Sequence, residues 1–439
     1  MQNDTIAAIA TAPGTGAIAV IRVSGPQAAR VVQECTGGRV LRPRLASLVR
    51  VRDAREYVVD ECVATYFAAP ASFTGEDTVE LSCHGGMLVT RRVLERVLAC
   101  GARPAEPGEF SRRAFENGKM DLTQAEAVMD VISAGSDLAL RAAQNQLQGA
   151  IGSKVEAAVD ILINVAAHVE AYIDFPEEDI APDTTETLLA QLDEVAAVLR
   201  RLLDTADEGR LLREGVRTAI VGAPNVGKSS LLNMLLGYER AIVSSTAGTT
   251  RDTIEESVVI DDIRFRFVDT AGLHDTEDKL EKMGIERTEK AIQKAQIVLY
   301  MTEPTQGETE IPALTDEQTL LLVVNKIDTS SAREFENAVY ISARDGEGID
   351  ELRQALRATV DTEGLYRGEV VVSNLRHFEA LSRAHRDMTQ AISALDYGIS
   401  EELLAEDIRS AINALAEITG RITSEDILKN VFANFCIGK

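Results

Sequence analysis

The sequence has 439 residues, of which 45% are hydrophobic, and carries a formal net charge of −25 from 70 acidic and 45 basic residues. This length and hydrophobic content suffice for two or three domains, each with a core of its own. The acidic balance excludes a broad electrostatic surface for nucleic acid, so any RNA must be held by a local basic patch or by a partner protein.

Three further features bear on the cellular location. No run of about 18 apolar residues occurs, so we expect no membrane span. The N-terminal segment has no basic stretch before its apolar residues, so we expect no secretory signal. The five cysteines form no CxxC pair, and their odd number argues against a disulfide framework. A cytoplasmic protein is the simplest expectation.

Residues 1–118 mix short apolar runs with glycine and proline, which is the pattern of short strands joined by turns. The segments IAVIRVSG (18–25) and TVELSC (78–83) predict two of these strands. We therefore expect an α+β domain at the start of the chain.

The pattern becomes helical in residues 119–213. Thr123 and Glu126 have the spacing of a capping box, and Asp183 and Glu186 are placed to cap a later helix. One apolar stripe runs along that later helix, made of Leu188, Leu192, Val195, Leu199 and Leu202. Such a stripe suits a helix bundle, so this segment is predicted to be the first part of a helical domain.

In residues 214–362 apolar strands alternate with helical segments, which predicts a parallel sheet covered by helices. The predicted strands are RTAIVG (217–222), RFRFVD (264–269, alternating as a half-buried strand does), IVLYM (297–301), LLLVVN (320–325) and VYIS (339–342). Helical pattern returns in residues 363–439, with helices at 377–395 and 402–420 and with Gly420 as a C-cap. The simplest arrangement is an α/β domain inserted into a discontinuous helical domain.

The segment GAPNVGKSS (222–230) matches the phosphate-binding pattern G-x-x-x-x-G-K-[ST] in its required context, between a strand and a helix. Gly222 and Gly227 allow the tight turn that aims backbone N–H groups at phosphate oxygens, and the helix N-terminus adds a positive dipole. Lys228 can reach the β- and γ-phosphates, and the Ser229 hydroxyl can bind Mg²⁺.

Two later loops are predicted to complete the γ-phosphate side of the site. In DTAG (269–272), Asp269 would hold Mg²⁺ through a water, and the Gly272 N–H would contact the γ-phosphate. In AGTTRD (247–252), Thr250 is the candidate that brings its hydroxyl to Mg²⁺ when the γ-phosphate is present.

The base is predicted to be guanine. In NKID, Asn325 and Asp328 would recognise the guanine edge, because a carboxylate accepts from its N1–H and 2-amino donors, which adenine does not present. The stem of Lys326 would pack along the base, and SAR (342–344) fits a backbone contact to guanine O6. The four elements stand in the order and spacing of a Ras-like GTPase domain.

The water-orienting residue is not evident from the motifs. Leu273 stands where Ras-like proteins carry the glutamine that orients the attacking water, and leucine cannot do so. The acidic segment that follows offers five carboxylates, among which residue chemistry alone does not choose: Asp275, Glu277, Asp278, Glu281 and Glu286.

Together these segments resemble the MnmE (TrmE) family of tRNA modification GTPases. Inside the GTPase part the resemblance rests on GAPNVGKSSLLN, AGTTRD, DTAGL and KLEKMGIER. Outside it, the matching segments are FTGEDTVELSCHGG (73–86), RPAEPGEFSRRAFENGKMDLTQAEAV (103–128), QLQGA (146–150) and the terminal CIGK. The match covers the whole chain, although the acidic stretch 303–318 is short for a loop and helix of the family, which leaves its topology open.

The motifs and the resemblance together predict a GTP site. Its residues are Asn225, Val226, Gly227, Lys228, Ser229, Ser230, Ser244, Ser245, Thr246, Ala247, Gly248, Thr249, Thr250, Asp269, Thr270, Ala271, Gly272, Asn325, Lys326, Asp328, Ser342, Ala343 and Arg344. Mg²⁺ would be bound by Ser229 and Thr250. The resemblance further implies that Glu281 orients the water, and that K⁺ supplies the charge that other GTPases take from an arginine finger.

The family's potassium ligands match Asn225, Ser244, Thr246 and Thr249. Its GTPase domains pair face to face when GTP, K⁺ and Mg²⁺ are bound, so the resemblance implies a homodimer and potassium-dependent hydrolysis.

The resemblance also implies a tetrahydrofolate-binding-like fold for the N-terminal domain. The family's folate-contacting positions match Arg22, Glu80, Lys119 and Lys439, which would bind a tetrahydrofolate derivative. Cys436 in the terminal CIGK matches a functional cysteine, whose chemical role stays open. A C-terminal prenylation signal is rejected, because glycine is not aliphatic.

The function that the resemblance implies is GTP hydrolysis coupled to tRNA modification. With an FAD-containing partner of the MnmG (GidA) type, the protein would install a carboxymethylaminomethyl or aminomethyl group at C5 of the tRNA wobble uridine. Two alternatives are a ribosome-assembly GTPase of the Era or Der type, and a folate-handling scaffold with a vestigial GTPase domain. The C-terminal helices contain no GxxG flanked by basic residues, which argues against the first alternative, and the intact motifs argue against the second.

Overall fold

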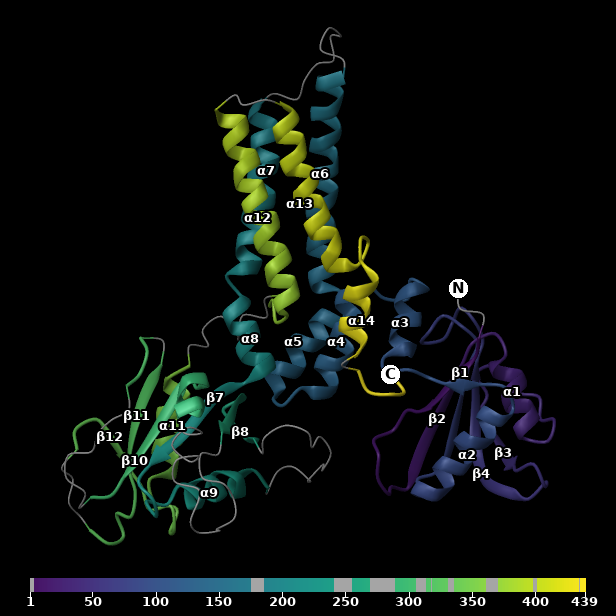
Figure 1. Cartoon of the computed structure of the whole chain (residues 1–439), viewed down its shortest axis with the longest axis horizontal. Coiled ribbons are helices and arrows are strands. Elements are labelled where there is room, and N and C mark those ends of the chain that lie inside the picture. The colour runs from purple at the N-terminus through teal and green to yellow at the C-terminus, as the bar shows by residue number, and fades with distance from the viewer. Residues whose placement is uncertain are drawn as a thin grey trace. The chain divides into compact units, whose positions relative to one another are not determined.

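The structure is a computed structural model that describes residues 4–174, 185–240, 255–268, 289–304, 313–316, 318–330, 335–360, 370–397, 401–433 and 435–439. The chain divides into two compact units. Unit 1 consists of Met1–Met129, Gln146–Val198 and Ala380–Lys439, and unit 2 consists of Asp130–Asn145 and Leu199–Glu379. Figure 1 shows the elements of both units along the chain.

Unit 1 begins with a six-stranded sheet in the order β3-β4-β5-β2-β1-β6. The strands are β1 (Ile6–Ile9), β2 (Ile18–Ser24), β3 (Ser47–Arg52), β4 (Val58–Phe67), β5 (Thr78–His84) and β6 (Arg103–Pro104). Helices α1 (Ala28–Cys35) and α2 (Met87–Ala99) pack in one core with the buried sheet residues. The strands predicted at 18–25 and 78–83 are therefore confirmed, as is the α+β character of this part.

A partly buried network of charges connects Asp4, just before β1, to helix α3 (Glu109–Glu116). Arg113, whose side chain is 3% exposed, pairs with Asp4 at 2.7 Å, with Glu109 at 2.9 Å and with Glu76 at 3.2 Å. Arg103 pairs with the same Asp4 and Glu109. Burial by itself raises the pKa of Glu109, but hydrogen bonds from Arg103, the Glu106 N–H and Arg113 bring the pKa below its ordinary value.

A further set of helices in the described residues forms the helical segments of the chain. They are α4 (Leu122–Ser133), α5 (Asp137–Leu147), α6 (Ala150–Asp174), α7 (Thr185–Leu203), α8 (Ala206–Glu214), α12 (Leu375–Asp396), α13 (Glu401–Thr419) and α14 (Glu425–Ala433). Within unit 1, α6 and α13 run side by side although more than 200 residues separate them in the chain (Figure 1). In α13, Gly420 follows the last residue with φ +83°, which confirms it as the C-cap.

The capping box predicted at Thr123 and Glu126 is wrong. Helix α4 begins at Leu122, and its box is formed by Asp121 and Gln124. The Gln124 N–H donates to Asp121 Oδ1 at 2.8 Å, and the Asp121 N–H donates to Gln124 Oε1 at 2.9 Å. Thr123 lies inside the first turn, where its hydroxyl donates to Asp121 Oδ1. Asp121 takes the cap position because its backbone lies outside the helix and its Oδ1 accepts from both the Gln124 N–H and the Thr123 hydroxyl.

The predicted stripe along α7 is buried at four of its positions: Leu192, Val195, Leu199 and Leu202. Leu188 is half-buried, and Asp183 lies outside the described residues. Among the helices that the structure describes, none combines the length and apolar character that a membrane crossing requires.

Unit 2 holds a six-stranded sheet in the order β12-β11-β10-β7-β9-β8. Its strands are β7 (Val216–Gly222), β8 (Glu255–Ile260), β9 (Ile263–Val268), β10 (Ile297–Thr302), β11 (Thr319–Val324) and β12 (Ala338–Tyr340). All neighbours are parallel except β8 and β9. Helices α9 (Lys228–Arg240) and α11 (Ile349–Ala358) share a core with the sheet.

The predicted strands of this sheet are confirmed, and β9 alternates as expected, with Phe265 and Phe267 both fully buried. Several strand ends differ from the predicted ones by one residue, the antiparallel strand β8 was not predicted, and β12 ends two residues earlier than expected. The strand stops at Tyr340, because Ser342 already belongs to a turn in which its N–H donates to the Glu347 carbonyl at 2.9 Å.

Candidate nucleotide-binding site

The phosphate-binding loop joins β7 to α9, and its two motif glycines cannot be replaced without collision. Gly222 has φ +145°, and a Cβ there would lie 2.3 Å from the Met301 carbonyl oxygen. Gly227 has φ +103°, and its Cβ would lie 2.2 Å from Asn325 Nδ2. Both positions therefore require glycine for conformation and for space. The loop is thereby pressed against the carboxyl ends of the neighbouring strands.

Positive charge collects at the start of α9. Lys228 is its first residue, and the Lys228 ammonium donates to the carbonyl oxygens of Gly222 and Ala223, each at 2.9 Å. Ser229 and Ser230 follow in the first turn and are exposed, as is Asn225, which has φ +64°. A lysine, a helix N-terminus and exposed hydroxyl groups at one loop fit a phosphate chain with its Mg²⁺.

Asn325 connects three motifs from a buried position. Its side chain is 2% exposed, and Nδ2 donates to the Val226 carbonyl in the phosphate-binding loop at 2.8 Å. Its Oδ1 accepts from the Ala343 N–H of SAR at 2.9 Å. The Asn325 N–H donates to the Thr302 carbonyl at the end of β10. Sequence reasoning assigned this residue to the guanine edge and missed this part, although an amide directly after a buried strand was the available signal.

The remaining groups on the base side lie around Asp328 and Ser342. The Asp328 side chain is exposed, whereas Ser342 is fully buried. Ser342 Oγ lies 3.1 Å from Asp328 Oδ1 and 3.2 Å from Asp345 Oδ2. The Ser342 hydroxyl has one proton, so it donates to one of these two carboxylates at a time. Arg344 is exposed at the rim.

Lys326, between these groups, has φ +68°, and its ammonium forms an ion pair with Glu303. Sequence reasoning did not single out Glu303. The signal available was an acidic residue directly after a buried strand that neighbours the NKID strand.

The other predicted site residues lie outside the described residues. These are Ser244, Ser245, Thr246, Ala247, Gly248, Thr249 and Thr250, together with Asp269, Thr270, Ala271, Gly272 and Glu281. The structure therefore brings together the phosphate-binding loop, NKID and SAR.

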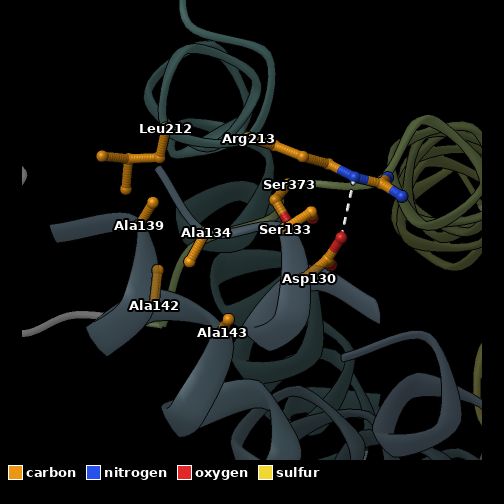
Figure 2. Close-up of a pocket in the computed structure, with 9 residues that line it drawn as sticks. All are labelled: Asp130, Ser133, Ala134, Ala139, Ala142, Ala143, Leu212, Arg213 and Ser373. Atoms are coloured by element: carbon orange, nitrogen blue, oxygen red, sulfur yellow. Dashed lines mark ion pairs between the residues drawn. The ribbon is translucent and has the colours of Figure 1, made fainter. Parts of the chain in front are cut away.

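A small pocket in unit 2 is separate from this site. Figure 2 shows it between the end of α4, α5, α8 and the segment at Ser373, with an ion pair of 3.0 Å between Arg213 and Asp130 on one side. Four of its nine lining residues are alanines, namely Ala134, Ala139, Ala142 and Ala143, and none of the nine belongs to a nucleotide motif. Small side chains let these helices approach closely, so we interpret the pocket as a gap in helix packing and not as a binding site.

Three of the four predicted folate-contacting residues meet in unit 1. Arg22 pairs with Glu80 on the neighbouring strand β5 at 2.9 Å, and its guanidinium lies 5.3 Å from the centre of the Phe73 ring. Arg22 also reaches the Gly438 carbonyl at 3.5 Å, one residue before Lys439. Burial and the charge of Arg22 lower the pKa of Lys439. A cation, an anion and an aromatic face thus share one region.

Close packing brings the C-terminal tail to this region. Gly438 has φ +101°, and a Cβ there would lie 2.3 Å from the Ile9 carbonyl oxygen. The fourth predicted residue, Lys119, donates its ammonium to the Pro70 carbonyl at 3.1 Å and has its stem beside Gly75. The loop that carries Phe73 therefore connects the two places.

Cys436 is the exposed cysteine of the tail, whereas Cys35, Cys62 and Cys83 are buried. Burial raises the pKa of both Cys35 and Cys62 to about 12. Since the thiolate is the reactive form, these two are poor nucleophiles.

Comparison with known proteins places this arrangement in a family. Residues 122–436 match the family described as MnmE helical domain, and residues 5–119 match the family described as GTP-binding protein TrmE N-terminus. The tRNA modification GTPase MnmE of Akkermansia muciniphila is 50% identical over 445 residues, which is 99% of each protein. The proteins of the same name from Opitutus terrae and Clostridioides difficile are 43% and 41% identical, covering 100% of this chain and 99% of their own.

Proposed function

The chain belongs to the MnmE family of tRNA modification GTPases, and we propose that it hydrolyses GTP as part of the modification of the tRNA wobble uridine. The observation that carries this proposal is the 50% identity over 99% of the chain to a tRNA modification GTPase. The phosphate-binding loop and NKID, joined through Asn325, supply the matching chemistry. The Era or Der alternative is not favoured, because the match extends over parts that lie outside the GTPase motifs.

In the proposed site each described residue has a defined part. The backbone N–H groups around Gly227 and the start of α9 bind the phosphates, Lys228 neutralises their charge, and Ser229 contributes a hydroxyl to Mg²⁺. Asp328 accepts from the guanine edge. Asn325 positions SAR by accepting a hydrogen bond from the Ala343 N–H. Guanine is selected because the Asp328 carboxylate needs two donors that adenine lacks.

For hydrolysis we assign the water-orienting part to Glu281 and a potassium site to Asn225, Ser244, Thr246 and Thr249. Asn225 fits this assignment, because it is exposed on the phosphate-binding loop, where its backbone is left-handed. K⁺ would supply positive charge beside the phosphoryl group, and Thr250 and Asp269 would complete the Mg²⁺ site. Glu281 orients the water in place of the glutamine that Leu273 replaces.

A second site is proposed for a tetrahydrofolate derivative. Arg22, Glu80 and Lys439 would contact it, with Lys119 at the edge of the same loop. The paired Arg22 and Glu80 and the ring of Phe73 suit a ligand that has carboxylates, ring donors and a flat ring system. Cys436 lies on the tail that reaches this region, which supports a functional part for its thiol.

Family membership supports a proposal for the wider organisation. We propose domains at 1–118 (tetrahydrofolate-binding-like), 119–213 and 363–439 (helical), and 214–362 (GTPase, inserted). We further propose a cytoplasmic homodimer that acts on tRNA with an FAD-containing protein of the MnmG type. The folate would supply the methylene carbon of an aminomethyl-type group at C5 of the wobble uridine.

One experiment tests the hydrolytic proposal directly. GTP turnover is measured in K⁺ and in Na⁺ for the wild type and for Glu281→Ala. We expect turnover selective for K⁺ and a loss of at least about a hundredfold in Glu281→Ala, with little loss of nucleotide affinity. Normal turnover in Glu281→Ala would remove that residue from the mechanism. Unchanged wobble uridines in the tRNA of a deletion strain, analysed by mass spectrometry, would reject the tRNA function.

A further inference from the structure

Glu303 lies directly beside the start of NKID because of the sheet register. Strands β10 and β11 are parallel, with Thr302 opposite Val324 as the last pair. The Asn325 N–H then donates to the Thr302 carbonyl at 2.9 Å, which carries the alignment one residue further. Pro304 follows Glu303 and disfavours a helical backbone at Glu303. The carboxylate is thus delivered to the carboxyl edge of the sheet, where the base-binding residues lie.

The carboxylate of Glu303 forms an ion pair with the ammonium of Lys326. Their side chains are 28% and 37% exposed, so both remain partly covered by the protein. The backbone of Lys326 is left-handed, with φ +68°, a conformation that non-glycine residues adopt at a cost. The lysine is therefore held at both ends, at its backbone by the turn after β11 and at its charge by Glu303.

We infer that Glu303 is a positioning residue for purine binding. Its ion pair fixes the ammonium of Lys326, and this orders the aliphatic stem of Lys326 as a surface on which the base packs. This inference rests on the proposed nucleotide site, in which the stem of Lys326 packs along guanine. A free lysine side chain loses rotamer entropy when it is immobilised. With the ion pair in place, much of that ordering precedes nucleotide binding.

The expected consequence is a uniform loss of binding when Glu303 is removed. The stem contacts the face of the base, which is far from the bond that breaks, so ground state and transition state weaken equally. Such a change raises KM and leaves kcat unchanged. The effect is also blind to the guanine 2-amino group, so GDP and IDP weaken by the same factor. A partly exposed ion pair sets the size of the loss at about three- to fivefold.

The test uses the full-length chain with Glu303→Ala and, as a control of equal charge change, Glu289→Ala, an exposed glutamate outside the site. Dissociation constants are measured with fluorescent GDP and IDP analogues, and GTP turnover is measured in K⁺. We expect Glu303→Ala to weaken both nucleotides about three- to fivefold with kcat unchanged, and Glu289→Ala to match the wild type. Unchanged affinity in Glu303→Ala, or a loss confined to GDP, would overturn the inference.

A double-mutant cycle separates positioning from a general structural effect. Lys326→Met keeps an apolar stem and removes the charge that Glu303 holds. In this background Glu303→Ala should cost no further affinity, because its partner is already gone. An equal loss in both backgrounds would show that Glu303 acts through something other than Lys326. A wild type that binds no guanine nucleotide at all would instead refute the proposed function from which this inference starts.

Discussion

We expect Asn325 to stabilise the fold of the GTPase part even without bound nucleotide, in addition to any contact with the base. Its buried side chain donates to the Val226 carbonyl and accepts from the Ala343 N–H. Asn325→Ala removes the side chain that bonds to both groups, and so leaves the Val226 carbonyl and the Ala343 N–H buried without this hydrogen bond. The perturbation is therefore larger than the loss of two contacts, because the two orphaned groups keep their desolvation cost.

The magnitude follows from these two groups. Each buried, unsatisfied polar group costs roughly 1–3 kcal/mol, so Asn325→Ala should lower the free energy of unfolding of unit 2 by about 2–6 kcal/mol. For a unit of this size each kcal/mol lowers the melting temperature by about 2–4 °C. We expect the transition of unit 2 to fall by at least about 4 °C without any nucleotide.

The assay is thermal unfolding of the nucleotide-free protein, followed by calorimetry so that separate transitions are resolved. Asp328→Ala serves as the matched control. Its carboxylate is exposed and accepts from the Ser342 hydroxyl, so its loss should cost less than about 1 kcal/mol while abolishing the preference for guanine. If nucleotide-free Asn325→Ala melts with the wild type and loses only affinity, the asparagine is a base-contacting residue and the reasoning from its buried bonds is wrong.

Two predictions concern unit 1. The lowered pKa of Glu109 means that its charge stabilises the fold above its unfolded pKa, about 4.3, and that this stability is lost as the pH falls through its folded pKa. Glu109→Gln should therefore lower the urea midpoint at pH 7 and flatten its decline between about pH 5 and pH 3, and an unchanged decline would exclude Glu109 as its source. Gly438→Ala should push the tail off the Ile9 carbonyl and weaken binding of a tetrahydrofolate derivative several-fold, measured by equilibrium dialysis with GTP affinity as the internal control. Equal folate affinity would remove the tail from the second site.

Local sequence was a good guide wherever the signal spans neighbouring residues. The strand and helix periodicities, the glycine spacing of the phosphate-binding loop and the C-cap at Gly420 all depend on residues within one element, and the structure confirms them. The capping box failed at this same scale, because Thr123 and Asp121 compete two residues apart and side-chain reach decides between them.

The sequence by itself determined the family and the motif set of this protein, since both are recognised from short runs of contiguous residues. Only the tertiary structure decided which groups meet: Asn325 with Val226 and Ala343, Glu303 with Lys326, and Arg22 with the backbone of Gly438, more than 400 residues away. The physical reason is that hydrogen bonds and ion pairs act over about 3 Å, whereas the chain brings such partners together only through the register of its strands and the packing of its ends.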